Sequence, residues 1–129
     1  MTLTLATIIS LTIPLPALAH GPTGRTPAGD KLRATVYRTD PCLARIIDRE
    51  NPPWDPTLYN GFTNWHPGDP PSSRSYGLPQ AQPPEKMASA GPDWRTNPYT
   101  QLAWMRGYVK ARYGSACAAL ASWLRKRWY

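Results

Sequence analysis

The sequence contains few of the side chains that bind metal ions. Its only histidines are His20 and His66, and its only cysteines are Cys42 and Cys117. A structural zinc site brings four such ligands together at short characteristic spacings, and neither histidine has such a spacing with a cysteine. We therefore expect neither a metal ion nor another cofactor.

Charged side chains are absent from residues 1–19, which are rich in Leu, Ile, Ala and Thr and end in Ala17-Leu18-Ala19. A tripeptide with a small residue at each end is the pattern that signal peptidase cleaves. Pro14 and Pro16, in a run near the lower limit for spanning a bilayer, argue against a permanent transmembrane helix. We predict a secretory signal peptide over residues 1–19. An uncleaved anchor and a misassigned start codon are the alternatives, because no Lys or Arg precedes the apolar run.

Acidic side chains are scarce: 8 Asp and Glu stand against 15 Lys and Arg, a formal net charge of +7. The excess predicts an anionic partner such as nucleic acid, an acidic cell-wall polymer or a membrane surface. Cations alternate with aromatic rings near the C-terminus. The residues concerned are Arg106, Lys110, Arg112, Arg125, Lys126 and Arg127, with Trp104, Tyr108, Trp123, Trp128 and Tyr129. This mixture suits single-stranded nucleic acid and sugar rings equally, so composition leaves both open.

The length of 129 residues allows one small domain, and the chain has no internal repeat. Most of its 16 prolines and 9 glycines fall in residues 51–92, which we predict to be loop and short helical turns. Such a long irregular segment is commonly a binding surface or disordered. Residues 20–39 are predicted to be a flexible basic segment, with a short strand over residues 32–37 as the alternative.

Three helices are predicted from capping residues and apolar spacing. The predicted caps are Asp40, Asn97 and Ser115, before helices over residues 41–50, 98–113 and 116–126. Gly114 is the predicted left-handed residue that ends the second helix. Gly107, in the middle of that helix, costs about 1 kcal/mol relative to Ala and indicates close approach by another element. We expect core positions for at least two of Trp94, Trp104 and Trp123, because a small domain needs large apolar side chains.

Glu50 is predicted to lie on the same helical stripe as Leu43, Ile46 and Ile47, because offsets of three, four and seven residues share one helix face. The carboxyl therefore points toward the core. Burial disfavours the charged form, so we expect the pKa of Glu50 to exceed the roughly 4.3 of a free side chain. A carboxyl that is neutral near neutral pH can act as a general acid. The alternative is an exposed Glu50 paired with a neighbouring arginine.

The two cysteines are predicted to form a disulfide, because export leads to an oxidising compartment. In the chain-entropy model a bridge between Cys42 and Cys117 is worth roughly 4 kcal/mol. Both residues lie near predicted helix N-termini, so the bridge would hold the first and third predicted helices together. Two buried free thiols are the alternative.

Several short sequence motifs follow one another along the chain. They are Arg49-Glu50-Asn51, Asp55-Pro56, Ser75-Tyr76-Gly77-Leu78-Pro79-Gln80, Asp93-Trp94-Arg95-Thr96-Asn97-Pro98, Tyr113-Gly114-Ser115-Ala116-Cys117 and Trp128-Tyr129. This order resembles the lysozyme-like lytic transglycosylases, especially compact secreted forms of actinobacteria and their phages. That family has a helix ending in Glu-Ser, then an Asp-Pro or Asn-Pro, then a Tyr-Gly-Leu-x-Gln segment and closing helices. The resemblance covers about residues 42–129, and its C-terminal third is the most specific part.

The resemblance implies a mainly α fold, a small lysozyme-like helical domain over residues 40–129 with a long Pro/Gly-rich loop region. Glu50 would be the catalytic acid and base. Asn51, Tyr76, Gly77 and Gln80 would line the substrate cleft, and Gln80 would hydrogen-bond the sugar chain. The partner would be peptidoglycan glycan strands, with anionic cell-wall polymers as a second partner. We expect a secreted or cell-wall-associated monomer.

The implied activity is cleavage of the bond between N-acetylmuramic acid and N-acetylglucosamine, leaving 1,6-anhydro ends, with Glu50 as the one carboxyl and the substrate acetamido group as its complement. A hydrolase that uses Glu50 with Asp55 is one alternative. Another is a non-catalytic wall-binding or aggregation-promoting module, because Asn51, Pro52-Pro53 and Pro79 depart from the family motifs. A protein that binds single-stranded nucleic acid is the weakest of these alternatives.

Overall fold

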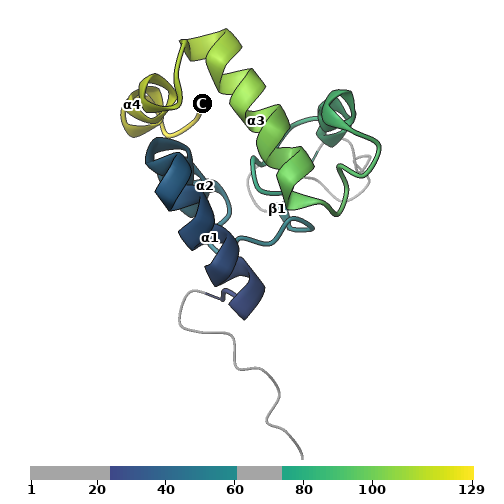
Figure 1. Ribbon diagram of the computed structural model, residues 1–129. Helices are drawn as coiled ribbons and strands as arrows, with labels where there is room; N and C mark the ends of the chain where they lie inside the picture. Colours follow the sequence, from purple (N-terminus) through teal and green to yellow (C-terminus); the bar gives the residue numbers. More distant parts are fainter. Residues whose placement is uncertain (1–23, 61–73) are drawn as a thin grey trace, which may run out of the picture.

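The computed structural model describes residues 24–60 and 74–129 (Figure 1). The signal peptide predicted for residues 1–19 lies outside the described residues, as do residues 20–23 of the predicted flexible segment. The described part is mainly helical, which confirms the predicted mainly α class. None of its helices is both long and apolar enough to cross a lipid bilayer.

Within the described ranges the chain forms four α-helices, one 3-10 helix and a two-stranded sheet. Their order is α1 (Pro27–Thr39), α2 (Pro41–Glu50), β1 (Tyr59–Asn60), β2 (Ser75–Tyr76), η2 (Pro84–Ala90), α3 (Pro98–Tyr113) and α4 (Ala116–Lys126). The two strands are antiparallel, with Tyr59 opposite Tyr76. Helix α2 packs against α1 and α4, and α3 packs against α4 and η2, so η2 and α2 lie on different sides of α3 (Figure 1).

The three predicted helices are confirmed, and their capping residues act as predicted. The side chains of Asp40, Asn97 and Ser115 each accept a hydrogen bond from a backbone N–H in the first turn of the helix. Gly114 ends α3 in the left-handed conformation, with φ of 84°. Glycine reaches this conformation without the steric penalty that a Cβ brings.

Helix α1 corrects the prediction of a flexible segment or short strand over residues 20–39. Thr26 caps the helix by accepting a hydrogen bond from the third residue after it, and Pro27 occupies the first turn. Leu32 and Val36, one turn apart, are buried in the core. Burial of this apolar pair outweighs the strand preference of the Thr-Val-Tyr run, because strand propensity depends strongly on tertiary context.

Asp48 holds α1 against α2. Its carboxylate accepts hydrogen bonds from Arg33 Nε and Nη2 at 2.7 and 2.8 Å, from the Tyr37 hydroxyl at 2.6 Å and from Trp54 Nε1 at 2.8 Å. Burial raises the pKa of Asp48, but the hydrogen bonds from Arg33, Tyr37 and Trp54 outweigh burial and lower the pKa to about 2. The ionised carboxylate is therefore the stable form of this contact.

Replacing Asp48 by Asn should lower the free energy of unfolding at pH 7 by about 2 kcal/mol. An unfolded Asp titrates near pH 3.9, and the folded pKa is about 2. The stability from Asp48 is therefore present above about pH 4 and lost as pH falls toward 2. Urea unfolding at several pH values measures both effects.

Asp30, whose side chain is 61% exposed in its ion pair with Arg25, gives the matched control, and Asp30→Asn should change stability by less than about 1 kcal/mol. If the free energy of unfolding of Asp48→Asn fell between pH 4 and pH 2 as steeply as that of the wild type, the prediction would be contradicted.

The core consists of two clusters of buried side chains. The larger draws on all four α-helices and on Trp54 and Leu78, and it includes Leu43, Ile46 and Ile47, the apolar face predicted for α2. The smaller contains Tyr76, Ala81, Met87 and Trp94. Trp104 of α3 packs against both clusters. This residue therefore lies between the two core clusters.

Gly107 departs from its prediction. It is exposed in the middle of α3, and a Cβ built on it would meet no atom of the described residues within 4 Å. No element of residues 24–60 and 74–129 approaches it closely, so packing within this part of the chain does not explain a glycine that costs about 1 kcal/mol relative to Ala.

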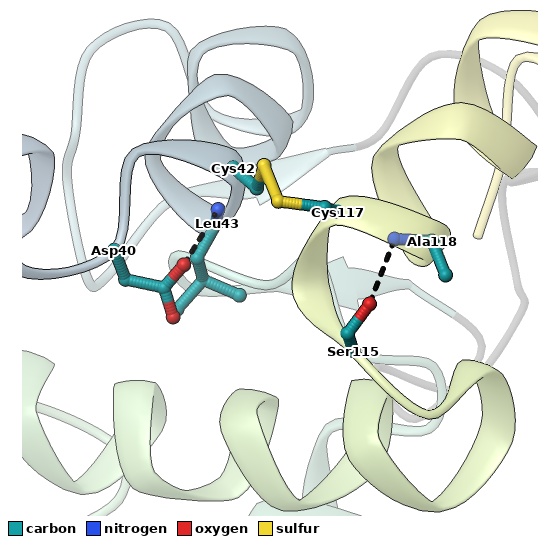
Figure 2. The surroundings of a disulfide bond; sticks show 6 residues. All are labelled: Asp40, Cys42, Leu43, Ser115, Cys117 and Ala118. Atoms are coloured by element: carbon teal, nitrogen blue, oxygen red, sulfur yellow. Dashed lines mark hydrogen bonds between the residues drawn. A yellow bond between two sulfur atoms is a disulfide. The ribbon is translucent and has the colours of Figure 1, made fainter.

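The Cys42 and Cys117 sulfur atoms are 2.02 Å apart, a disulfide bond (Figure 2). This is the pairing that the sequence predicts. Cys42 lies in the first turn of α2 and Cys117 in the first turn of α4. The bridge therefore joins these two helices at their N-terminal ends.

Candidate functional site

Glu50 is the last residue of α2 and is half-buried. Its Oε1 accepts a hydrogen bond from Trp123 Nε1 of α4 at 2.5 Å. Burial raises the pKa of Glu50, and the bond from Trp123 offsets this in part. No ion pair within residues 24–60 and 74–129 involves Glu50: Arg49 instead donates to the Arg45 carbonyl and lies over the Trp123 ring. Partial desolvation thus favours the protonated form of the carboxyl, while the hydrogen bond from Trp123 favours the carboxylate.

Glu50 opens onto a cavity of about 230 Å³. Polar and aromatic side chains from α2, α3, the segment after β2 and the C-terminal segment share its wall. They include Glu50, Gln80, Trp104, Tyr108, Trp128 and Tyr129. The rings of Trp104 and Tyr108 are stacked, with centroids 5.1 Å apart and planes 17° apart. A sugar ring can place its apolar C–H face on such a surface while its hydroxyls reach the polar groups.

Tyr129 closes one side of this cavity. Its hydroxyl donates a hydrogen bond to the Pro79 carbonyl, and its ring meets Tyr108 edge-on. Burial, and secondarily the Glu50 charge, raise the pKa of Tyr129 well above its ordinary value. The phenol is therefore neutral, and it fixes the C-terminal segment against the loop that carries Gln80.

Gln80 carries an unused hydrogen-bond acceptor at the same cavity. Its Nε2 donates to the carbonyls of Leu58 at 3.2 Å and Gly77 at 2.8 Å, so these two acceptors fix the orientation of the amide. Its Oε1 is buried and has no hydrogen-bond partner among the residues that the structure describes. The residue is only 8% exposed and adopts a left-handed φ of 50°, uncommon for a residue with a side chain. A buried acceptor left unpaired costs about 1–3 kcal/mol, which a donor on a bound ligand would offset.

Asn51, Tyr76 and Gly77, the other predicted substrate contacts, do not line this cavity. Asn51 is fully buried, donates to the carbonyls of Asp55 and Gly77 at 2.7 and 2.9 Å, and accepts from the Asp55 N–H. The Tyr76 hydroxyl donates to the Arg95 carbonyl at 2.5 Å, and its ring belongs to the smaller core cluster. The contacts of Asn51 and Tyr76 are thus with the surrounding loops and with the smaller core cluster.

Gln101 of α3, which is fully buried, connects three of these loops. Its Oε1 accepts from the Leu78 N–H at 2.9 Å, and its Nε2 donates to the carbonyls of Pro56 and Trp94, both at 2.8 Å. Gly77, with φ of 75°, packs directly on this amide, and a Cβ there would lie 2.7 Å from Gln101 Oε1. The glycine is therefore required by backbone conformation and by space.

Replacing Gln101 by Leu should lower the free energy of unfolding by about 3 kcal/mol or more, because it leaves buried backbone groups of three loops unpaired. Thermal unfolding measures the loss. Lys110→Leu, a substitution by the same residue at an exposed position of α3, is the control and should shift stability by about 0.5 kcal/mol or less. Equal melting temperatures for the two variants would show that Gln101 does not organise the loops.

Asp55, the second carboxyl of the hydrolase alternative, does not join Glu50. Its Oδ1 accepts hydrogen bonds from the Thr57 N–H at 2.8 Å and hydroxyl at 2.7 Å. Asp55 lines a different cavity, between α1 and the start of α3. Among the described residues Glu50 is the one carboxylate on its own cavity.

The tryptophans depart in part from their predicted core positions. Trp94 is buried as expected, but Trp104 and Trp123 are half-buried, one on the cavity wall and one bonded to Glu50. The alternation of rings and cations near the C-terminus was the available sequence signal. It could not show which rings face the acid, because that depends on how α3, α4 and the C-terminal segment pack.

The described part of the chain holds no group of three or more His, Cys, Asp or Glu side chains that could bind a metal ion. No protein-family model, curated protein or solved structure matches the chain significantly.

Proposed function

We propose that the protein is a peptidoglycan lytic transglycosylase with a lysozyme-like fold, in which Glu50 is both acid and base. The observation that carries the proposal is the half-buried Glu50 carboxyl, bonded to Trp123 and opening onto a cavity with Gln80 and stacked aromatic rings. Burial raises the pKa of Glu50, the direction that favours the proton-donating form of a general acid.

The reaction needs one carboxyl at the reacting bond. Glu50 gives its proton to the glycosidic oxygen between N-acetylmuramic acid and N-acetylglucosamine, and the muramic 2-acetamido group stabilises the oxocarbenium-like centre at C1. Glu50, now a carboxylate, takes the proton of the C6 hydroxyl while O6 bonds to C1. The products are a 1,6-anhydro end and a free N-acetylglucosamine C4 hydroxyl, and Glu50 is protonated again. This substrate assistance is a known exception to the two-carboxylate rule, and it agrees with the place of Asp55 at a different cavity.

The remaining groups bind the sugar chain. Gln80 Oε1 accepts a hydrogen bond from a sugar N–H or O–H, and Trp104 and Tyr108 contact the apolar ring faces. The disulfide suits an exported protein. With a net charge of +7, the protein also suits the anionic polymers of a cell wall.

Product analysis tests the proposal. Purified protein is incubated with peptidoglycan, and the soluble products are identified by mass spectrometry. We expect muropeptides with 1,6-anhydro ends. Reducing ends without anhydro products would indicate a hydrolase, and no release at all would reject glycan cleavage.

A non-catalytic wall-binding module is the second candidate, and the place of Asn51 favours it. The family has a serine hydroxyl after the acid, whereas the Asn51 amide is fully buried and bonded to the loop backbone. Sedimentation with insoluble peptidoglycan separates the two candidates. Binding without product release supports the module.

Replacing Trp123 by Phe should move the alkaline limb of the activity profile to higher pH. The Trp123 N–H stabilises the Glu50 carboxylate and so lowers its pKa, and Phe keeps the ring without the donor. Initial rates from pH 4 to 9 measure the limb. Trp94→Phe, a core tryptophan away from Glu50, is the control and should leave the limb in place. An unmoved limb in Trp123→Phe would contradict the link between Trp123 and the acid.

A further inference from the structure

The C-terminal ends of α3 and α4 carry exposed cations next to exposed apolar side chains. Leu124 and Trp128 are 45% and 49% exposed, two of the four large hydrophobic side chains exposed within residues 24–60 and 74–129. The side chains of a helix's last turn surround its end, so a surface that meets the end of α4 can contact all of them. We define the Trp128 patch as the exposed residues Arg112 of α3 and Leu124, Arg125, Lys126, Arg127 and Trp128.

Trp128 brings the cations of two helices together. The C-terminal segment that carries it lies between α3 and α4 (Figure 1). The Arg112 guanidinium carbon lies 5.7 Å from the Trp128 ring centroid, and Lys126 Nζ lies 5.0 Å from it. The Arg112 guanidinium carbon is also 5.9 Å from the Tyr108 centroid and 5.8 Å from the Tyr113 centroid. Such ring contacts orient a cation without neutralising its charge.

No carboxylate of the described residues pairs with the cations of the Trp128 patch. Residues 94–129 contain no Asp or Glu. The ion pairs within residues 24–60 and 74–129 join Arg25 to Asp30, Arg33 to Asp48 and Arg106 to Asp40, and none includes a residue of the patch. This end of the molecule therefore keeps a positive potential that attracts an anionic partner.

The apolar members of the patch decide which anionic partner fits. Cations in the last turn of a helix interact favourably with its dipole, but the dipole does not account for the exposed Leu124 and Trp128. A soluble polyanion would contact the cations and leave the Leu124 side chain in water. An anionic bilayer offers both partners, because its headgroup phosphates bind Lys and Arg while its interface accepts Leu and Trp. Tryptophan is enriched at that interface, where its apolar ring and its polar N–H are both accommodated.

We propose that the Trp128 patch docks the protein on the surface of an anionic phospholipid bilayer. Leu124 and Trp128 enter the boundary between headgroups and acyl chains, and the four cations contact lipid phosphates. The guanidinium groups can each bind a phosphate through two N–H groups. Because Trp128 also lines the Glu50 cavity, docking brings that cavity next to the bilayer. The inference does not depend on the proposed function, since it concerns only the binding surface.

Cosedimentation of the exported protein with lipid vesicles tests the docking. One set of vesicles is phosphatidylcholine alone, and the other is an equal mixture of phosphatidylcholine and phosphatidylglycerol. We expect binding to the mixed vesicles only, and weaker binding as salt rises, because salt screens the attraction to the lipid charge. Equal binding to both sets, or binding to neither, would overturn the proposal.

Removing cations of the patch should weaken binding to the mixed vesicles. Arg125→Gln with Lys126→Gln should lower the affinity roughly tenfold or more, because each cation near an anionic membrane contributes about fivefold. Lys31→Gln with Arg38→Gln removes the same charge from exposed positions of α1 and is the control. The control should change the affinity less than about twofold. An equal loss in the two double variants would overturn the patch, because only net charge would then matter.

Removing the apolar members separates a bilayer from a soluble polyanion. Leu124→Gln with Trp128→Gln should weaken binding to the mixed vesicles roughly tenfold or more, while binding to soluble polyphosphate stays within about twofold. Tyr99→Gln, which removes an exposed ring at the start of α3, is the control and should leave vesicle binding unchanged.

Thermal unfolding shows whether each variant is folded. If the double variant melts lower than the parent protein, Leu124→Gln alone repeats the test at an exposed position of α4. Parent and variants carry the same N-terminal residues, so differences among them arise from the substitutions. Unchanged vesicle affinity in the folded Leu124 variant would overturn membrane docking and assign the cations to a soluble polyanion.

Discussion

Replacing Glu50 by Gln should reduce the release of anhydro-muropeptides to background. A glutamine has nearly the shape of glutamate and can still accept the hydrogen bond from Trp123 Nε1, but it can neither give nor take the transferred proton. Positioned acids contribute about 10²–10⁴ to rate, and Glu50 is the one carboxylate on the described cavity wall. Mass spectrometry of peptidoglycan digests, with wild type and variant at equal concentration, measures the loss.

Glu85→Gln is the matched control for this experiment. Glu85 is exposed in the first turn of η2 and does not line the Glu50 cavity. The control loses the same charge, so it should keep full turnover. Full activity in Glu50→Gln would show that the proposed acid is wrong.

Stability distinguishes lost chemistry from lost folding. Burial raises the folded pKa of Glu50 above the roughly 4.3 of an unfolded Glu. The favourable contribution of the neutral carboxyl is therefore complete below about pH 4 and is lost as pH rises through the folded pKa. At pH 7 the Glu50→Gln protein should be at least as stable as wild type, so an inactive variant with an unchanged or higher melting temperature supports the catalytic role.

Replacing both Cys42 and Cys117 by Ser should lower the free energy of unfolding by roughly 4 kcal/mol in the chain-entropy model, because the bridge closes a loop of 75 residues in the unfolded chain. This is a large share of the 5–15 kcal/mol typical of a domain. Helix α2 has only 10 residues and helices this short are marginal alone, so its C-terminal end and Glu50 should become less ordered. Thermal unfolding measures the first effect and turnover the second.

Wild-type protein in reductant should reproduce the behaviour of the double variant, which separates loss of the bridge from effects of the serines. Non-reducing mass spectrometry of exported protein should detect no free thiol. Two alkylatable thiols in native exported material would contradict both the bridge and the predicted secretory route.

Local chemistry was sufficient to predict α2, α3 and α4. Asp40, Asn97 and Ser115 each mark a helix start with a side chain that satisfies first-turn N–H groups, and Gly114 marks an end. Helix α1 was missed although Thr26 and Pro27 carry the same signal. Its neighbouring glycines and β-branched residues favour other conformations, and only packing against α2 reverses that preference.

The candidate site was predictable to the extent that a single helix or motif defines it. Helical spacing alone indicates that Glu50 points inward, and Gln80, named through the motif resemblance, lines the same cavity. The motif neighbours Asn51 and Gly77 do not line that cavity, and a short motif does not distinguish a residue that touches a ligand from one that positions it. Tyr129 could not be assigned in advance, because its contact with Pro79 joins distant parts of the chain.

The disulfide also fixes the rotation of α4 about its own axis relative to α2. Helices α2 and α4 are joined near their N-terminal ends through Cys117, and again six residues later where Trp123 meets Glu50. Each residue added to an α-helix turns the remainder of the helix by about 100° and advances it by about 1.5 Å. One residue inserted between Cys117 and Trp123 would therefore swing the indole away from the acid while the bridge stayed closed. The number of residues between Cys117 and Trp123 therefore determines where the indole lies relative to Glu50. Substitutions in this stretch should be tolerated better than insertions or deletions.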